Sequence, residues 1–351
     1  MSAVIPFHPR QRGRASVDFL VHIGRGAAAL GEQAKRAVSA MSGDAAELPD
    51  DLDAFNEAME SRLYDDPAFR VEQLLGEWHY RRHGLICREA FEEVGKQIKG
   101  ELRALDDGLT TLEANPQLPS PTYWEGVAFH RTAGKWDDYE FQGFVHAELV
   151  HRRIVDAFFP GGIVRQRKMV AELAPRDQYR RILDMGCSTG YFTLALAETY
   201  VDAEIAGVDL SLRCLEHARR QANHNGFAWH LAQRPAEDTG FDADSFDLVA
   251  SFILLHELPA EVIQSVFFEA FRVLEPGGDL IMSDVSRYAD MDKISRWRAD
   301  RGAMYGGEPH WRESASLDLA ALARRAGFVD VEAGAHGPNA YPYVVQGRKP
   351  L

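Results

Sequence analysis

The sequence contains few cysteines, no long apolar run and a deficit of positive charge. Its three cysteines, Cys87, Cys187 and Cys214, are too widely spaced for a zinc motif and argue against a structural disulfide. No stretch of about 18 apolar residues occurs, so we expect no membrane span. Acidic residues outnumber basic ones 53 to 39, and a net charge of -14 disfavours nucleic acid as a partner. We therefore expect a cytoplasmic protein that acts on neither membranes nor nucleic acid.

The 351 residues exceed the length of one typical domain. Residues 1–48 carry arginines with few acids, weakly typical of a transit peptide, and we expect a mobile, alanine-rich tail with a short helix. From about residue 48 to 107 apolar residues recur at helical spacing and predict two packed helices within a helical N-terminal domain at 49–175. The predicted apolar positions are Phe69, Leu74, Leu75 and Trp78, then Phe91, Val94, Ile98, Leu102 and Leu105.

After residue 175, short apolar runs alternate with amphipathic helices, a pattern typical of an α/β domain with a parallel sheet between two helical layers. Seven strands are predicted, at 181–185, 204–209, 228–232, 246–252, 279–284, 328–333 and 341–348. We therefore expect residues 176–351 to form a doubly wound, seven-stranded, Rossmann-like sheet.

The segment 182–190, ILDMGCSTG, predicts a buried strand, a tight turn and the start of a helix. Glycines at such a turn let the backbone approach a ligand, and the helix N-terminus favours an anionic group. A dinucleotide fingerprint would need glycine where Ser188 stands, and a third glycine is missing.

The same segment also satisfies G-x-S-x-G, the nucleophile elbow of α/β-hydrolases. Ser188 would then be the nucleophile, with Asp284 and either His310 or His336 completing the triad. Against this alternative, everything before Arg181 has a helical pattern, and no oxyanion loop of the H-G-G-G type occurs.

A third interpretation uses more of the chain, because Asp209 ends the next predicted strand, where an acid can accept hydrogen bonds from ribose hydroxyls. Further pieces follow in order: AED at 236–238, FDLV at 246–249 and LEPGG at 274–278. With the glycine loop and Asp209, they resemble the class I S-adenosylmethionine-dependent methyltransferases. The resemblance implies S-adenosylmethionine as the cofactor, with the loop at its methionine part, Asp209 at its ribose and Glu237 beside its adenine. The implied cofactor-binding residues are Asp184, Gly186, Cys187, Ser188, Gly190, Asp209, Leu210, Ala236, Glu237 and Ser251.

His256 follows the fourth predicted strand of this domain, and ligands of open α/β sheets lie at the carboxyl ends of strands. The segment resembles that of small-molecule O-methyltransferases with a helical N-terminal dimerisation domain, which implies that His256 deprotonates an acceptor hydroxyl. Asp284, at the end of the next strand, is expected to orient a substrate or a histidine, or to cap a helix. The insertion 287–312 is placed to cover the acceptor.

These patterns favour methyl transfer to a small organic molecule, most simply at oxygen, with the N-terminal helices shaping the acceptor pocket and able to pair two protomers. A cofactor-binding regulatory or scaffold protein is the alternative. The pairs His79 and His83, and His146 and His151, lack matching carboxylates, so no metal is expected.

Overall fold

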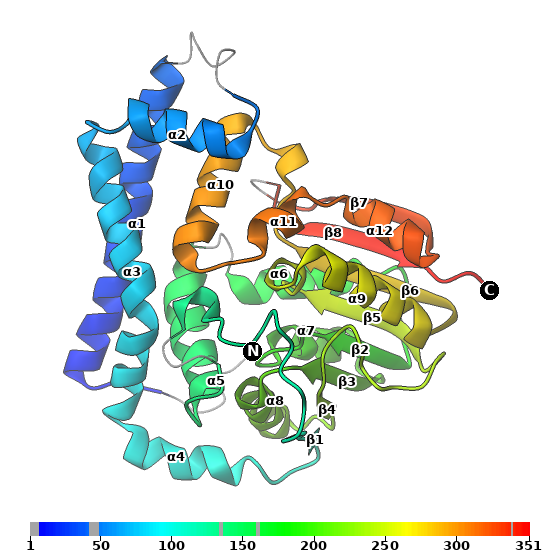
Figure 1. Cartoon of the computed structure of the whole chain (residues 1–351). Coiled ribbons are helices and arrows are strands. Elements are labelled where there is room, and N and C mark those ends of the chain that lie inside the picture. Colours follow the sequence, from blue (N-terminus) through cyan, green and yellow to red (C-terminus); the bar gives the residue numbers. More distant parts are fainter. Residues whose placement is uncertain (1–6, 42–48, 133–135, 159–161, 338–339) are drawn as a thin grey trace.

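An eight-stranded, mostly parallel sheet forms the centre of the molecule (Figure 1). The computed structural model describes residues 7–41, 49–132, 136–158, 162–337 and 340–351. The strand order is β1-β4-β3-β2-β5-β6-β8-β7, with β8 antiparallel to both of its neighbours. The strands are β1 (Thr111–Glu113), β2 (Arg181–Met185), β3 (Glu204–Asp209), β4 (His230–Gln233), β5 (Phe246–Phe252), β6 (Leu274–Asp284), β7 (Val329–Ala335) and β8 (Tyr343–Arg348).

The seven predicted strands are confirmed, and the eighth is a correction to the expected sheet. β1 lies upstream of Arg181 and pairs in parallel with the edge of β4. It has three residues, too few for the alternation by which a strand is recognised in a sequence. At the other edge, β7 is irregular between Val329 and Glu332, where Asp330 has a φ of 50°.

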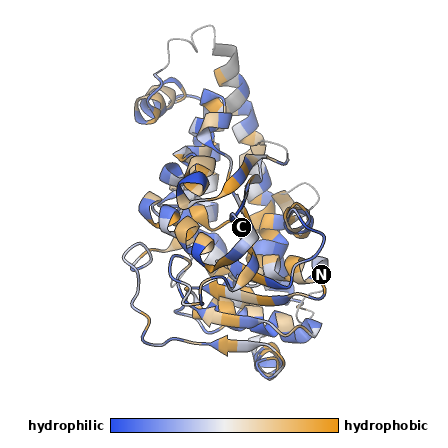
Figure 2. Cartoon of the chain, turned by 90° about the vertical axis from the view of Figure 1, so that its right-hand side faces the viewer, coloured by the Kyte–Doolittle hydropathy of each residue, from blue (hydrophilic) through white to orange (hydrophobic). Residues whose placement is uncertain are grey.

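Helices cover both faces of the sheet, as a doubly wound fold requires. One hydrophobic cluster joins strand residues such as Ile182 to α6 (Ile163–Glu172), α7 (Tyr191–Thr199) and α8 (Leu212–Asn225). A second cluster joins the next residues along the strands, such as Leu183, to α9 (Ala260–Val273) and α12 (Leu319–Ala326). Successive strand side chains point to opposite faces, and hydrophobic residues run along the strands in Figure 2.

The N-terminal segment differs from the expected mobile tail with a short helix. Residues Gln11–Met41 form one 31-residue helix, α1, which packs along α3 (Pro67–Glu92) (Figure 1). Its described buried positions fit a seven-residue repeat: Gly13, Val17, Leu20, Ala27, Gly31, Ala34 and Val38. Small residues occupy four of these seven positions, so the apolar stripe is weak in the sequence although it fits closely against its neighbour. Residues 1–6 and 42–48 of the expected tail lie outside the described residues.

Three helices, not two, follow α1: α2 (Leu52–Arg62), α3 and α4 (Gly95–Ala104). Phe91, Ile98 and Leu102 are buried as predicted, but Leu74 and Trp78 are exposed on the outer side of α3. The chain then passes through β1 to the short helical segments η2 (Phe129–Arg131), α5 (Gln142–Phe144), η3 (Val145–Ile154) and η4 (Val155–Phe158). The segment η3 is a π-helix.

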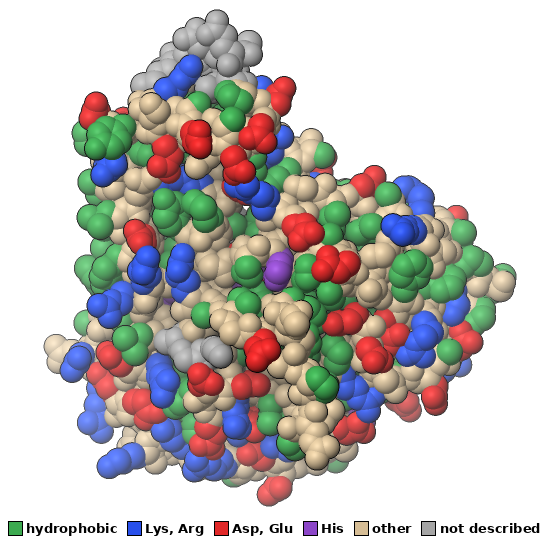
Figure 3. All heavy atoms as spheres, viewed as in Figure 1, with side chains coloured by type: hydrophobic (Ala, Val, Ile, Leu, Met, Phe, Trp, Pro, Cys, Tyr) green, Lys and Arg blue, Asp and Glu red, His purple; other side chains and the backbone are tan. Residues whose placement is uncertain are grey.

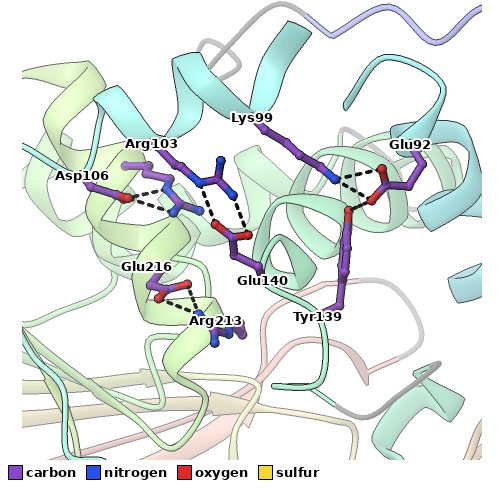
Figure 4. Close-up of polar contacts among 9 residues, drawn as sticks. Glu92, Lys99, Arg103, Asp106, Tyr139, Glu140, Arg213 and Glu216 are labelled. Carbon is purple, nitrogen blue, oxygen red and sulfur yellow. Dashed lines mark hydrogen bonds and ion pairs between the residues drawn. The ribbon is translucent and has the colours of Figure 1, made fainter. Parts of the chain in front are cut away.

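The N-terminal helices and the sheet domain are tied together by packing and by ion pairs. The insertion after β6 forms η6 (Tyr288–Asp290), α10 (Lys293–Gly306) and α11 (Trp311–Ser316). Trp297 of α10 packs among Phe55 and Phe69 of the N-terminal helices. After α4, Asp106 pairs with Arg220 of α8 at 2.7 Å (Figure 4). The insertion is therefore part of the helical layer in space.

The surface carries acidic and basic side chains intermixed, as one face shows in Figure 3. Among the described residues, no helix combines the length and the apolar character that a membrane crossing requires.

Candidate active site

The glycine loop joins β2 to α7 through a backbone that glycine allows. Gly186 has a φ of 70°, and its N–H donates to the carbonyl of Val208 on the next strand. A Cβ at this position would lie 2.7 Å from the side chain of Leu254, so the loop passes close to the end of β5. Gly190, with a φ of 83°, is the N-cap of α7. These contacts hold the loop at the carboxyl edge of the sheet, as the sequence predicts.

Asp209, the last residue of β3, fixes the loop from the side. Its carboxylate accepts the N–H of Ser188 at 2.9 Å and that of Ser211 at 2.8 Å. Burial raises the pKa of Asp209 to about 6, although these two N–H groups favour the charged form. The carboxylate lies in a cavity wall and retains lone pairs for a ligand hydroxyl.

A cavity of about 240 Å³, here the strand-end cavity, lies beside this loop. Six expected cofactor residues line it: Gly186, Ser188, Asp209, Leu210, Ala236 and Glu237. The other four, Asp184, Cys187, Gly190 and Ser251, are buried and are not among the lining residues. Asp184 accepts the hydroxyl of Thr193 at 2.6 Å, and burial raises its pKa to about 7. Asp184 therefore ties the end of β2 to α7 behind the loop.

The strand-end cavity also has walls that the sequence did not predict. Tyr123 donates to Glu237 at 2.6 Å, and Trp124 and Trp136 line the cavity beside it. Arg167 of α6 is buried in the same wall, with its guanidinium 4.8 Å from the ring of Phe252. The aromatic composition of the segment 123–139 could have indicated a binding surface. No local sequence pattern, however, indicated that this segment reaches the end of the sheet.

A second cavity, of about 770 Å³, adjoins the first and is here the histidine cavity. The two share several lining residues, among them His130, His146, His151 and Tyr341. The insertion contributes residues such as Met291 and Trp311 to its wall. The lining histidines are His79, His83, His130, His146, His151, His256 and His336.

His256 lies in the 3-10 turn η5 (Leu255–Glu257) after β5, with both ring nitrogens facing carboxylates. Its Nδ1 is 3.1 Å from Asp284, and its Nε2 is 3.4 Å from Glu257. Burial opposes the charged ring, but the two carboxylates outweigh it and raise the pKa of His256 to about 10. Asp284 orients His256, one of the roles expected for it. In this arrangement His256 is an imidazolium and has no free nitrogen to accept a proton.

The neighbouring histidines are held neutral instead. Burial, and then the proximity of His79, lowers the pKa of His83 to about 4. Burial also lowers the pKa values of His146 and His151 well below the usual range. The π-helix η3 places these last two rings 4.1 Å apart, because residues five apart lie over one another in a π-helix.

The residues of the hydrolase alternative do not form a catalytic triad. The N–H of Ser188 donates to Asp209, and Asp284 binds His256, whereas the triad would require His310 or His336. Ser188 lines the strand-end cavity, and its φ of 47° belongs to the same loop geometry as Gly186.

Comparison with known proteins agrees with this geometry. Residues 182–278 match the family model of a methyltransferase domain. The chain is 30% identical over 163 residues to a malonyl-[acyl-carrier protein] O-methyltransferase of Legionella pneumophila, covering 46% of this chain and 51% of that protein. It is 33% identical over 174 residues to an erythromycin 3''-O-methyltransferase of Saccharopolyspora erythraea, covering 46% and 55%. An arsenite methyltransferase of Aquipseudomonas alcaligenes is 32% identical over 167 residues, covering 43% and 44%.

The chain thus spans about half the length of these curated relatives. The matched segment begins in β2, contains the glycine loop and Asp209, and ends within β6. Residues 182–278 therefore form a methyltransferase domain whose cofactor is S-adenosylmethionine.

Proposed function

We propose that the chain transfers a methyl group from S-adenosylmethionine to an oxygen of a small organic molecule. The observation that carries this proposal is the histidine cavity, which adjoins the cofactor-binding loop and has a volume of about 770 Å³. That volume lies within the usual range for small-molecule sites, about 300 to 1,000 Å³. Its walls come from the N-terminal helices and the insertion, which supports an enclosed acceptor chamber.

The charged residues of the strand-end cavity suit the cofactor. Asp209 would accept the ribose hydroxyls, and Glu237, held by Tyr123, would border the adenine. Arg167 is a buried cation in the same wall and is placed to pair with the methionine carboxylate. The bound cofactor supplies an electrophilic methyl group on a sulfonium.

Within the acceptor chamber, the chain has to align the acceptor, exclude water and remove a proton. His256 was expected to be the base, but we propose that it is a positioning residue, because Asp284 and Glu257 hold it as an imidazolium. His146 and His151 are neutral and line both cavities, so they are the imidazoles placed to accept the proton of an acceptor hydroxyl.

The preference for oxygen is supported by two observations. The Legionella and Saccharopolyspora relatives are named for methylation at oxygen. An arsenic acceptor, as in the name of the third relative, is soft and favours thiolates. All three cysteines are buried, and no cysteine is among the described residues that line the histidine cavity.

The test is turnover of S-adenosylmethionine by the purified chain with a panel of hydroxylated aromatic and aliphatic compounds. Formation of S-adenosylhomocysteine together with a product 14 Da heavier would support the proposal. Tight binding of the cofactor without turnover on any acceptor of the panel would favour the regulatory or scaffold alternative.

We further propose that two copies of the chain pair through the outer side of α1 and α3. Val71, Leu74, Trp78 and Leu85 are exposed on α3 at intervals of three, four and seven residues, and Phe19 of α1 contacts Trp78. Hydrophobic side chains line this edge of the molecule in Figure 3. Substitution Leu74→Glu is expected to shift the mass measured by light scattering from dimer to monomer; a wild-type monomer at micromolar concentration would contradict the proposal.

A further inference from the structure

Three potential metal ligands converge where the two cavities meet. His130 comes from η2, Glu257 from η5 and Glu308 from the loop after α10. One ligand atom from each residue lies within 4.8 Å of the others. Among the described residues this is the group that converges in this way, and it includes none of His79, His83, His146 and His151.

The hydrogen bonds of this cluster leave two carboxylate oxygens unused. His130 Nε2 lies 2.9 Å from Oε1 of Glu257, and His130 Nδ1 makes a short contact with Oε1 of Glu308. The Oε2 atoms of Glu257 and Glu308 are both buried, and neither has a hydrogen-bond partner within the described part of the chain. Leaving a buried acceptor of a charged group without a partner is costly, so two such atoms in one cluster indicate a missing cation.

The backbone holds these ligands in place. His130 and Arg131 have φ values of 52° and 50°, a left-handed conformation that side chains other than glycine rarely adopt. The guanidinium of Arg131 donates to the carbonyl of Tyr305 near the end of α10. Gly307, just before Glu308, approaches so closely that a Cβ would lie 2.8 Å from the Arg131 side chain. Strained backbone of this kind persists where the surroundings fix it, often at functional sites.

We propose that His130, Glu257 and Glu308 bind one divalent first-row transition metal ion. Carboxylate ligands suit Mn²⁺ and imidazole suits Fe²⁺ or Zn²⁺, so Mn²⁺ or Fe²⁺ fits the mixed set best. His130 and Glu308 line the histidine cavity, and His130 and Glu257 line the strand-end cavity. If the proposed function holds, the ion binds the acceptor oxygen and lowers the pKa of its hydroxyl, so that the proton passes to a neutral histidine.

The experiment measures metal binding to the full chain without cofactor or acceptor, so its outcome is separate from that of methyl transfer. Chelator-treated protein is titrated with MnCl₂, and free Mn²⁺ is followed by electron paramagnetic resonance. One Mn²⁺ per wild-type chain is expected. Glu308→Gln and Glu257→Gln should weaken binding at least about tenfold, the loss that even outer-shell partners of a metal site cause.

Two controls keep the test interpretable. Glu313→Gln, at an exposed position on α11, and His79→Gln, in the same cavity but outside the cluster, should leave the Mn²⁺ affinity unchanged. If a glutamate variant unfolds, His130→Gln gives the same test, because its side chain is 34% exposed. Equal Mn²⁺ affinities of the wild type and the His130→Gln variant would overturn the proposal, as would an equal loss in the two controls.

Discussion

The strand-end cavity and the histidine cavity adjoin, but they are assembled in different ways. The first takes most of its key residues from loops that directly follow β2, β3 and β4, within a segment of about fifty residues. The second is built from α3, η2, η3, the turn after β5, the insertion and the segment before β8. A site at the ends of successive strands can be recognised from short sequence motifs. The histidine cavity instead depends on packing between segments that are far apart in the sequence. This difference explains why the cofactor could be inferred from the sequence and the acceptor could not.

The largest effect is expected from a substitution of Asp209, which lines the strand-end cavity and is not among the residues that line the histidine cavity. Asp209→Ala removes the acceptor for the ribose and for the N–H groups of Ser188 and Ser211, and hydrogen bonds to charged groups contribute about 1.5 to 3 kcal/mol each. Affinity for S-adenosylmethionine, measured by calorimetry, should therefore fall about 100-fold or more. Asp202→Ala, in the exposed turn before β3, is the control and should bind like the wild type. An unchanged affinity of Asp209→Ala would remove the ribose assignment.

The pH dependence of cofactor binding tests the same carboxylate. Burial raises the pKa of Asp209 to about 6, so the charged form that accepts ribose hydroxyls dominates above that pH and is lost below it. Affinity should fall about fivefold from pH 6 to pH 5, following the fraction of ionised carboxylate. Asp209→Asn should show a flatter profile. A wild-type profile that stays flat across this range would contradict the assignment.

A smaller effect is expected from a pair of glycines with similar backbone angles. Gly186 and Gly226 have φ values of 70° and 78°, so alanine at either position incurs a strain of about 1 to 2 kcal/mol. Only at Gly186 would the new Cβ also meet a neighbour, the side chain of Leu254. Chemical denaturation should therefore show Gly186→Ala to be about 1 kcal/mol less stable than Gly226→Ala, near the lower bound for overpacking. Equal losses of stability in the two variants would mean that the side chain of Leu254 moves aside without cost.

The smallest effect on cofactor affinity is expected from a substitution in the histidine cavity. Met291 lines the histidine cavity and is not among the residues that line the strand-end cavity. Met291→Trp should fill part of the acceptor chamber and reduce turnover of a small-molecule acceptor, while cofactor affinity changes by less than about twofold, because residues without shared partners usually act independently. A large loss of cofactor affinity would show that the two cavities act as one site.

The sequence predicted the seven longer strands because each combines a compact apolar run with flanking turn residues. It missed β1, which is too short for a pattern, and it missed the packing of α1, whose stripe relies on Gly31 and alanines. The contact between the rings of His146 and His151 could not be predicted either. In an α-helix, residues five apart point about 140° away from each other, and only the π-helix aligns them.

Likewise, Tyr123 and His130 reach the cavities from a segment without regular pattern. Their positions depend on two distant anchors, the pairing of β1 with β4 and the packing of α5 on α8. Local sequence carries no information on such anchors, because the contacts join residues about one hundred positions apart. The cofactor half of the candidate site could therefore be predicted largely from sequence, and the acceptor half could not.

The edges of the sheet determine how copies of this chain can meet. An open strand edge is a template for intermolecular pairing and aggregation. Here one edge ends in the three-residue β1, and the other edge, β7, is interrupted by an irregularity and carries the exposed acids Asp330 and Glu332. Neither edge strand is long, flat and uncharged enough to pair readily with a strand of a second copy. Strand addition is thus disfavoured, which agrees with the proposal that two copies pair through α1 and α3.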